Sequence, residues 1–236
     1  MYEPANYGPV GGQMFTFPVG EGTAPGFLSL PSGGQGPGVV VLHPWWGLTE
    51  PFRRFCDRLA QHGFTALAPD LYRGETTDTP EIAQALGSAL DKDEARWRGD
   101  IIGAVHELHR HDPAGERGRI ALVGFSLGGG YALDMSTMLA DQIAAVVLFY
   151  AAWSEPEFAR ATAAYLCHYA EHDPFEDPGE AEKMERRMRD GGRSVLSHRY
   201  PGTQHWFFEM NRPEYHPEAS ALAWDRTVAF LHQHLG

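Results

Sequence analysis

The amino-acid sequence predicts an α/β fold in which a mostly parallel, doubly wound sheet is flanked by helices. Three observations predict it: short apolar runs that do not alternate with polar residues, amphipathic segments of helical length between them, and glycines or prolines at the junctions. Runs without alternation are typical of parallel strands that are buried on both faces. Regular alternation of strand and helix over such a length indicates a doubly wound sheet.

Eight segments of the sequence have the composition of strands. The two nearest the amino terminus are short and lie between glycine and proline turns. The glycine-rich stretch 31–38 is expected to form a hairpin-like connection into the third strand. The expected strands are residues 14–17, 26–30, 39–42, 64–69, 120–124, 144–150, 164–169 and 194–200.

Helical patterns fall between the later strands, with apolar residues at intervals of three or four. Residues 72–80 are rich in turn formers, so a connecting segment is expected there. Because no internal repeat or change of composition divides the chain, we expect one domain over residues 1–236. The expected helices are residues 50–61, 93–109, 127–139, 180–190 and 219–235.

Charge and hydropathy argue against two classes of partner. The net charge of −12 argues against nucleic-acid binding, which needs a basic face. The mean hydropathy is −0.35, and no apolar stretch approaches the length of a membrane span. Residues 1–12 lack the basic opening and apolar core of a signal peptide, so we expect a cytoplasmic protein. Cys56 and Cys167 are far apart and are expected to be small buried apolar residues.

The motif Gly124-Phe125-Ser126-Leu127-Gly128 lies where an expected strand meets an expected helix. A serine on such a sharp turn is exposed at the carboxyl edge of the sheet, and the two glycines let the backbone pass without steric clash. The amino end of the helix adds partial positive charge where an oxyanion forms. The motif and its context predict that Ser126 is an activated nucleophile. The alternative is a turn that only packs or binds phosphate, but no nucleotide-binding motif accompanies it.

A serine hydroxyl becomes nucleophilic when a base takes its proton, and an acid in turn orients the base. Among twelve histidines, His205 is the expected base, because it follows the last expected strand and so returns to the edge of the sheet. Asp173 follows the preceding strand and is the expected acid. Glu171 and Asp177 are competing carboxylates in the same loop.

Two backbone N–H groups are expected to bind the oxyanion. One belongs to Leu127, the residue after the nucleophile, and the other to the loop that follows residues 39–42. In that loop Pro44 has no N–H, so Trp45 is the expected donor. Trp45 and Trp46 also offer flat apolar walls to a substrate, with core packing as an equal alternative for Trp46.

These segments resemble the dienelactone hydrolase family, and the resemblance implies the α/β-hydrolase fold. It extends from about Gly38 to the closing helix. It is carried by VVVLHPWWGL (39–48), GFTALAPDLY (63–72), GRI (118–120), GFSLGGG (124–130) and the loops of Asp173 and His205.

The chain departs from what the resemblance implies. The founding enzymes of the family have a cysteine where this chain has Ser126, and a glutamate in the loop where this chain has Pro44. The two changes agree, because a hydroxyl activated by His205 has no need of a carboxylate that switches on a thiol. Those enzymes also bind an anionic lactone through arginines. Arg73 matches one of them, whereas the aromatic and acidic segment 206–209 replaces the other.

We therefore expect a serine hydrolase that cleaves a neutral or aromatic carboxylic ester, or a lactone, through an acyl-enzyme on Ser126. No metal or organic cofactor is expected. Trp46, Arg73 and Trp206 are the expected substrate contacts. Two alternatives stay open: a non-catalytic member of the fold that binds a small molecule, and a thioesterase or peptidase with the same triad. The sequence predicts no oligomeric state.

Overall fold

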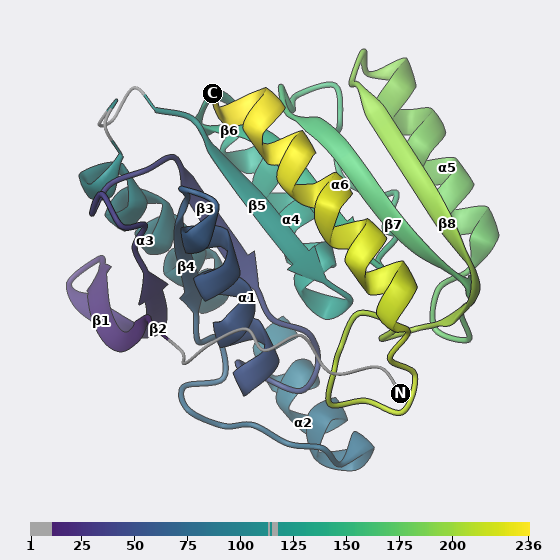
Figure 1. The fold of residues 1–236 in the computed structure, drawn as a ribbon, viewed down its shortest axis with the longest axis horizontal. Helices are drawn as coiled ribbons and strands as arrows, with labels where there is room; N and C mark the ends of the chain where they lie inside the picture. Colours follow the sequence, from purple (N-terminus) through teal and green to yellow (C-terminus); the bar gives the residue numbers. More distant parts are fainter. Residues whose placement is uncertain (1–10, 113, 115–117) are drawn as a thin grey trace.

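The computed structural model describes residues 11–112, 114 and 118–236, and Figure 1 shows their arrangement. The strands form one sheet of eight in the order β1-β2-β4-β3-β5-β6-β7-β8. β2 is antiparallel to both β1 and β4, and the other pairs are parallel. The strands are β1 (Gln13–Val19), β2 (Gly22–Ser29), β3 (Gly38–Leu42), β4 (Thr65–Pro69), β5 (Ile120–Phe125), β6 (Ile143–Phe149), β7 (Ala164–His172) and β8 (Val195–Gln204).

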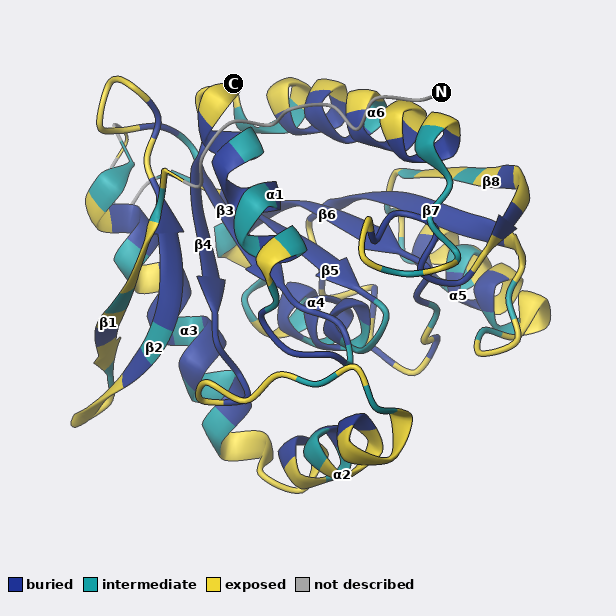
Figure 2. Cartoon of the chain, turned by 60° about the horizontal axis from the view of Figure 1, so that its bottom comes forward, coloured by how far each residue is buried: buried dark blue, intermediate teal, exposed yellow. Residues whose placement is uncertain are grey.

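Helices cover both faces of this sheet, which confirms the predicted fold class (Figures 1 and 2). Side chains of α1 and α6 pack on one face, and side chains of α3, α4 and α5 pack on the other. None of the described helices is long and apolar enough to cross a membrane. The helices are α1 (Glu50–Gln61), α2 (Pro80–Asp91), α3 (Glu94–His111), α4 (Leu127–Met138), α5 (Pro178–Asp190) and α6 (Pro217–Leu235), with a 3-10 turn, η2 (Ala140–Gln142).

The central strands are buried on both faces, as their unbroken apolar runs predict. In β3, Val39 and Val41 pack in the layer of α1 and α6, while Val40 and Leu42 pack in the layer of α3 and α4. All four side chains are fully buried. β3 therefore carries no polar side chain of its own, and the polar residue His43 follows directly after its end.

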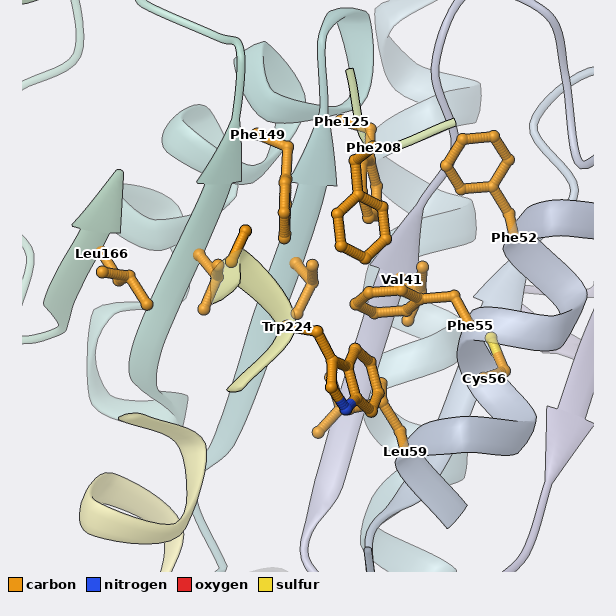
Figure 3. Close-up of a cluster of buried hydrophobic side chains, with 14 of the residues drawn as sticks. Val41, Phe52, Phe55, Cys56, Leu59, Phe125, Phe149, Leu166, Phe208 and Trp224 are labelled. Atoms are coloured by element: carbon orange, nitrogen blue, oxygen red, sulfur yellow. The ribbon is translucent and has the colours of Figure 1, made fainter. Parts of the chain in front are cut away.

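An aromatic cluster lies beneath the carboxyl ends of β5 and β6 (Figure 3). Phe55 of α1 meets Phe125 edge to face, with ring centroids 5.1 Å apart. Phe149 stacks on Phe125 at 4.5 Å, and Phe208 lies 4.7 Å from Phe149. Such pairs add roughly 0.5–1.5 kcal/mol each beyond the burial of their area. Because Phe125 directly precedes Ser126 in the chain, this packing fixes the backbone that presents the serine.

Two connections differ from the sequence-based expectation. Residues 80–91, for which the sequence pattern predicts no helix, form α2. In Figure 1, α2 lies beyond the tip of the β5 arrow. Pro80 is at its first position, where the missing N–H costs nothing, and the buried side chains of Ala83 and Leu90 hold it to the core. The stretch 31–38 is not a hairpin, because β4 lies between β2 and β3 in the sheet.

Both cysteines are buried, as expected. Cys56 lies in α1 and Cys167 in β7, and neither forms a disulfide. Burial raises the pKa of both thiols, that of Cys167 to about 12. Neither residue therefore supplies a thiolate at neutral pH.

Candidate active site

Ser126 lies between β5 and α4 at the carboxyl edge of the sheet. Its φ of 48° and ψ of −116° are strained for any residue other than glycine. Its N–H donates to the carbonyl of Phe149 at 3.0 Å, and its own carbonyl accepts from the N–H of Gly129 at 2.8 Å. These bonds hold the strained turn, and the half-buried side chain lines a cavity described below.

The glycines on either side of Ser126 are required by close backbone contacts. A Cβ atom on Gly124 would lie 2.5 Å from the carbonyl oxygen of Gly128. A Cβ atom on Gly128 would overlap the carbonyl of Leu42 and lie 2.7 Å from that of His43. The start of α4 therefore lies directly against the end of β3, so the loop after β3 comes close to the serine.

His205 directly follows β8, which extends beyond its expected end at residue 200. Its Nε2 lies 2.9 Å from Oγ of Ser126. Its Nδ1 lies 2.8 Å from each carboxylate oxygen of Asp173. When Nδ1 carries the proton and donates to Asp173, Nε2 is free to accept the proton of the serine hydroxyl. The side chains of His205 and Asp173 are only 2% and 7% exposed, so the hydrogen bond between these two residues is shielded from water.

Three aromatic rings surround the imidazole of His205. The ring centroids of Tyr150, Phe175 and Trp206 lie 4.8, 5.0 and 5.1 Å from that of the imidazole. These rings restrict rotation of the histidine. They also lower the local dielectric constant, which strengthens its hydrogen bonds.

Asp173 is oriented by its own turn. Its Oδ1 accepts the N–H groups of the second and third residues that follow it, at 3.0 and 3.1 Å. The two competing carboxylates have other partners. Glu171 accepts the N–H of Gly202 at 2.7 Å, and Asp177 caps the amino end of α5. Of the three, Asp173 is the one that hydrogen-bonds to His205.

Two other buried histidines have structural partners. In His168, Nδ1 lies 2.8 Å from the hydroxyl of Tyr200 and Nε2 lies 3.1 Å from that of Thr227. The Nε2 of His43 accepts the N–H of Leu71 at 3.2 Å, which ties the end of β3 to the segment after β4. Burial lowers the pKa of both imidazoles, so both are neutral at neutral pH.

The two expected oxyanion donors lie in segments that meet at this edge. Leu127 is the first residue of α4, so its N–H has no acceptor within the helix. Trp45 lies in a turn closed by a 3.2 Å hydrogen bond from the N–H of Gly47 to the carbonyl of Pro44. The contact between α4 and the end of β3 places this turn next to the segment that carries the serine.

A cavity of about 360 Å³ opens beside Ser126. This volume suits a small organic molecule. In the described part of the chain, no three His, Cys, Asp or Glu side chains are arranged to hold a metal ion. The cavity is lined by Asp91, Glu94, Trp97, Arg98, Ser126, Leu127, Gly130, Tyr131, Asp134, Ala151, Ala152, Trp153 and Glu176.

The three expected substrate contacts are not among these lining residues. Trp46 is 2% exposed and lies in the core, where its ring meets that of Trp206 at 5.2 Å. The guanidinium of Arg212 lies over the ring of Trp46 at 4.1 Å. Arg73 donates hydrogen bonds of 2.7 and 2.8 Å to the buried carboxylate of Asp100. The structure therefore gives all three side chains partners within the protein.

No pattern in the sequence singles out the aromatic and acidic residues that line the cavity. Trp97 of α3 stacks on Tyr131 of α4 at 4.5 Å, and Trp153 and Glu176 lie on the loops after β6 and β7. Burial, and then the negative charge of Asp173, raise the pKa of Glu176 to about 8. Only the closeness of Glu176 to Asp173 in sequence could have indicated one of these residues.

Four non-glycine residues of the described chain have a positive φ, and all lie in segments that follow strands at the carboxyl edge. They are Arg73 after β4, Ser126 after β5, Tyr150 after β6 and Trp206 after β8, with φ values of 58°, 48°, 40° and 67°. Backbone strain of this kind concentrates at functional sites. The strained residues thus lie at the same edge of the sheet as the hydrogen-bonded Asp173, His205 and Ser126.

Comparison with known proteins links this geometry to a family. The dienelactone hydrolase family matches residues 24–235 of the chain. Protein usf of Aquifex pyrophilus is 31% identical, and the match covers 95% of this chain and 99% of that protein. A putative carboxymethylenebutenolidase of Azospirillum brasilense is also 31% identical, with coverage of 94% and 98%. The crystal structure of a putative dienelactone hydrolase from Klebsiella pneumoniae has a TM-score of 0.79 and 25% identity, with coverage of 94% and 98%.

The family and the names of its members point to hydrolysis. The structural match extends over nearly all of both chains, so the α/β-hydrolase fold is confirmed as well. The resemblance first seen in the sequence is therefore correct, and the chain belongs to the dienelactone hydrolase family.

Proposed function

We propose that this protein hydrolyses carboxylic esters or lactones through an acyl-enzyme on Ser126. The observation that carries the proposal is the hydrogen-bonded series from Asp173 through His205 to Ser126, with spacings of 2.8 and 2.9 Å. The adjoining cavity supports it, because it gives a small substrate access to the serine hydroxyl. Membership of a hydrolase family supports it independently.

Acylation begins when Oγ of Ser126 attacks the carbonyl carbon and Nε2 of His205 takes its proton. Asp173 keeps the imidazole in the required tautomer and stabilises the imidazolium that forms. The N–H groups of Leu127 and Trp45 bind the oxyanion of the tetrahedral intermediate. The intermediate then collapses, and the leaving oxygen takes the proton from His205.

Deacylation repeats these steps with water as the nucleophile. His205 removes a proton from water, which attacks the acyl carbon, and then returns the proton to Ser126 as the acid is released. The residue at position 44 also suits a serine nucleophile. The family resemblance implies a glutamate there in the cysteine enzymes, where it switches on the thiol, and this chain has Pro44 instead.

The substitution Ser126→Ala tests the proposal. The kcat for a short p-nitrophenyl ester should fall by roughly 10⁴- to 10⁶-fold, because the nucleophile is lost. The matched control is Ser88→Ala, which changes a half-buried serine of α2 whose hydroxyl accepts a solvent-exposed hydrogen bond from Gln84, and it should retain the wild-type rate. A fluorophosphonate probe should label Ser126, as located by mass spectrometry of peptides.

Other outcomes separate the alternatives. A wild-type rate in the Ser126→Ala variant would overturn the proposal. A folded wild-type protein that escapes labelling, and that leaves a panel of esters, lactones and thioesters intact, would favour a non-catalytic binding protein. A preference for thioesters within the panel would assign the same residues to thioester hydrolysis.

A further inference from the structure

The cavity beside Ser126 has an acidic wall. Among the described residues that line it are four with carboxyl groups and one with a guanidinium group, Arg98. Arg98 forms ion pairs with two of these groups: it contacts Glu94 and also lies 2.8 Å from Asp134. The guanidinium is therefore held between two carboxylates and is not left to pair with a carboxylate on a substrate. The four carboxyl groups are those of Asp91, Glu94, Asp134 and Glu176.

Aromatic rings complete the same wall. The rings of Trp97 and Tyr131 stack on each other, and the hydroxyl of Tyr131 donates to Asp91 at 2.7 Å. Trp153, in the loop after β6, also lines the cavity and is 39% exposed. The faces of tryptophan and tyrosine rings attract cations, most strongly where water is partly excluded. Carboxylates and aromatic faces together form the chemical surroundings that an organic ammonium group prefers.

We propose that this cavity selects esters that carry a positively charged amine or quaternary ammonium group, and that it disfavours esters that carry a carboxylate. The inference rests on the proposed function, since the charge is recognised next to Ser126. An ammonium group would lie near Asp91, Glu94 and the aromatic rings, whereas a carboxylate would meet like charge. The net charge of −12 also draws cations towards the protein.

Glu176 makes this selectivity dependent on pH. Its Oε2 accepts the N–H of Ala152 at 3.0 Å, so the carboxyl group is fixed at the cavity wall. It lies near Asp173 of its own loop and Glu180 of α5, and their negative charges contribute after burial to a pKa of about 8. Arg98 and Asp134 line the same cavity from α3 and α4. Ionisation of Glu176 above about pH 8 adds one more negative charge and should strengthen the preference for cations.

Three acetate esters test the proposal. Their alcohols share one carbon skeleton and carry a trimethylammonium group, a neutral tert-butyl group or a carboxylate. We expect kcat/KM to be about five- to tenfold higher for the cationic ester than for its neutral isostere, and lower again for the anionic one. Glu94→Gln should reduce the ratio of cationic to neutral ester. Glu182→Gln makes the same charge change on the exposed face of α5 and should leave that ratio unchanged.

The pH dependence gives a second readout. From about pH 6.5 to about pH 9, the ratio of cationic to neutral ester should rise in the wild type and stay flat in Glu176→Gln. A ratio near one at every pH, with Ser126-dependent hydrolysis of the neutral ester, would overturn the inference and leave the proposed function intact. If no ester is hydrolysed, the proposed function fails. Titration of tryptophan fluorescence then decides the inference: tighter binding of phenyltrimethylammonium than of benzoate supports it, and the reverse overturns it.

Discussion

The hydroxyl of Tyr150 donates a 3.0 Å hydrogen bond to Glu209, and the Tyr150 ring packs against His205. Glu209 is 1% exposed, and its second carboxyl oxygen has no hydrogen-bond partner among the described residues. Burial therefore dominates its ionisation and raises the pKa of Glu209 to about 8. A carboxyl group that is largely protonated at neutral pH thus supports the ring that contacts the histidine.

This pKa predicts how stability depends on pH. The folded state holds the proton of Glu209 up to about pH 8, whereas the unfolded chain releases it near its ordinary pKa of 4.5. Stability contributed by this group is therefore present at low pH and is lost as the pH rises through this window, at about 1.4 kcal/mol per pH unit at most. Relative to Glu209→Gln, the wild type should lose up to a few kcal/mol between about pH 5 and about pH 8. Urea unfolding at both pH values measures the difference, and a constant difference would contradict the assignment.

Gly128→Ala should destabilise the protein by roughly 2–4 kcal/mol, because the new methyl group meets the carbonyls of Leu42 and His43. The matched control is Gly130→Ala in the same helix, where nothing lies within 4 Å of the added carbon. That control should be neutral or gain up to about 1 kcal/mol, since alanine favours a helix. Thermal unfolding of both variants gives the comparison. Equal effects would mean that α4 does not press against β3 as described.

Asp173→Asn should lower kcat/KM for a neutral ester by about 10⁴-fold, because an amide can hold His205 in the wrong tautomer. Glu171→Gln changes a neighbouring carboxylate that bonds to Gly202 instead, and should retain activity within a few-fold. Steady-state kinetics on the two variants distinguishes them. If Glu171→Gln is the more severely impaired, the acid has been assigned to the wrong residue.

Arg73→Ala tests whether Arg73 serves the fold or the substrate. Removing it leaves the buried carboxylate of Asp100 with the more distant Arg96, at 3.9 Å, as its remaining cationic partner among the described residues. Because the Arg73 side chain is 35% exposed, we expect a loss of only about 1–2 kcal/mol in the free energy of unfolding. In an Asp100→Asn background the same substitution should cost much less. Unchanged stability, with a raised KM for an anionic ester, would instead indicate a substrate contact.

The parts of the fold that the sequence predicted are those decided by local pattern. The unbroken run 39–42 needs apolar neighbours on both faces, so its position inside a parallel sheet follows directly. Ser126, Asp173 and His205 could be paired because each follows a strand, and parallel strands end at one edge. The length of β8 was underestimated, because Pro201 and Gly202 resemble a turn even though the strand continues through them.

The cavity wall could not be predicted, because it depends on how distant elements pack. The pattern of α3 indicates that Trp97 faces inward, but not that Tyr131 of α4 stacks on it. For the same reason, the sequence could not distinguish between substrate contact and core packing for Trp46. Its contacts with Trp206 and Arg212 join segments far apart in the chain, and these contacts hold it in the core.

The substitution Ser126→Gly should make the protein more stable than Ser126→Ala, because glycine adopts a φ of 48° without strain and alanine does not. A gain of about 1 kcal/mol is expected, or roughly 2–4 °C in Tm. Differential scanning calorimetry on the two inactive variants isolates the backbone effect from loss of the hydroxyl. Equal Tm values would show that the turn is not strained.

The clustering of positive φ at one edge has an evolutionary consequence. Strain of about 1–3 kcal/mol at each of Arg73, Ser126, Tyr150 and Trp206 adds up to a large share of the roughly 5–15 kcal/mol that keep a domain folded. At Arg73, Tyr150 and Trp206 a change to glycine would also remove packing or an ion pair, but the small side chain of Ser126 contributes little of either. A lineage relieved of selection on the chemistry could therefore gain stability by replacing Ser126 with glycine, and glycine at this position would mark, from sequence alone, a member that has abandoned the chemistry.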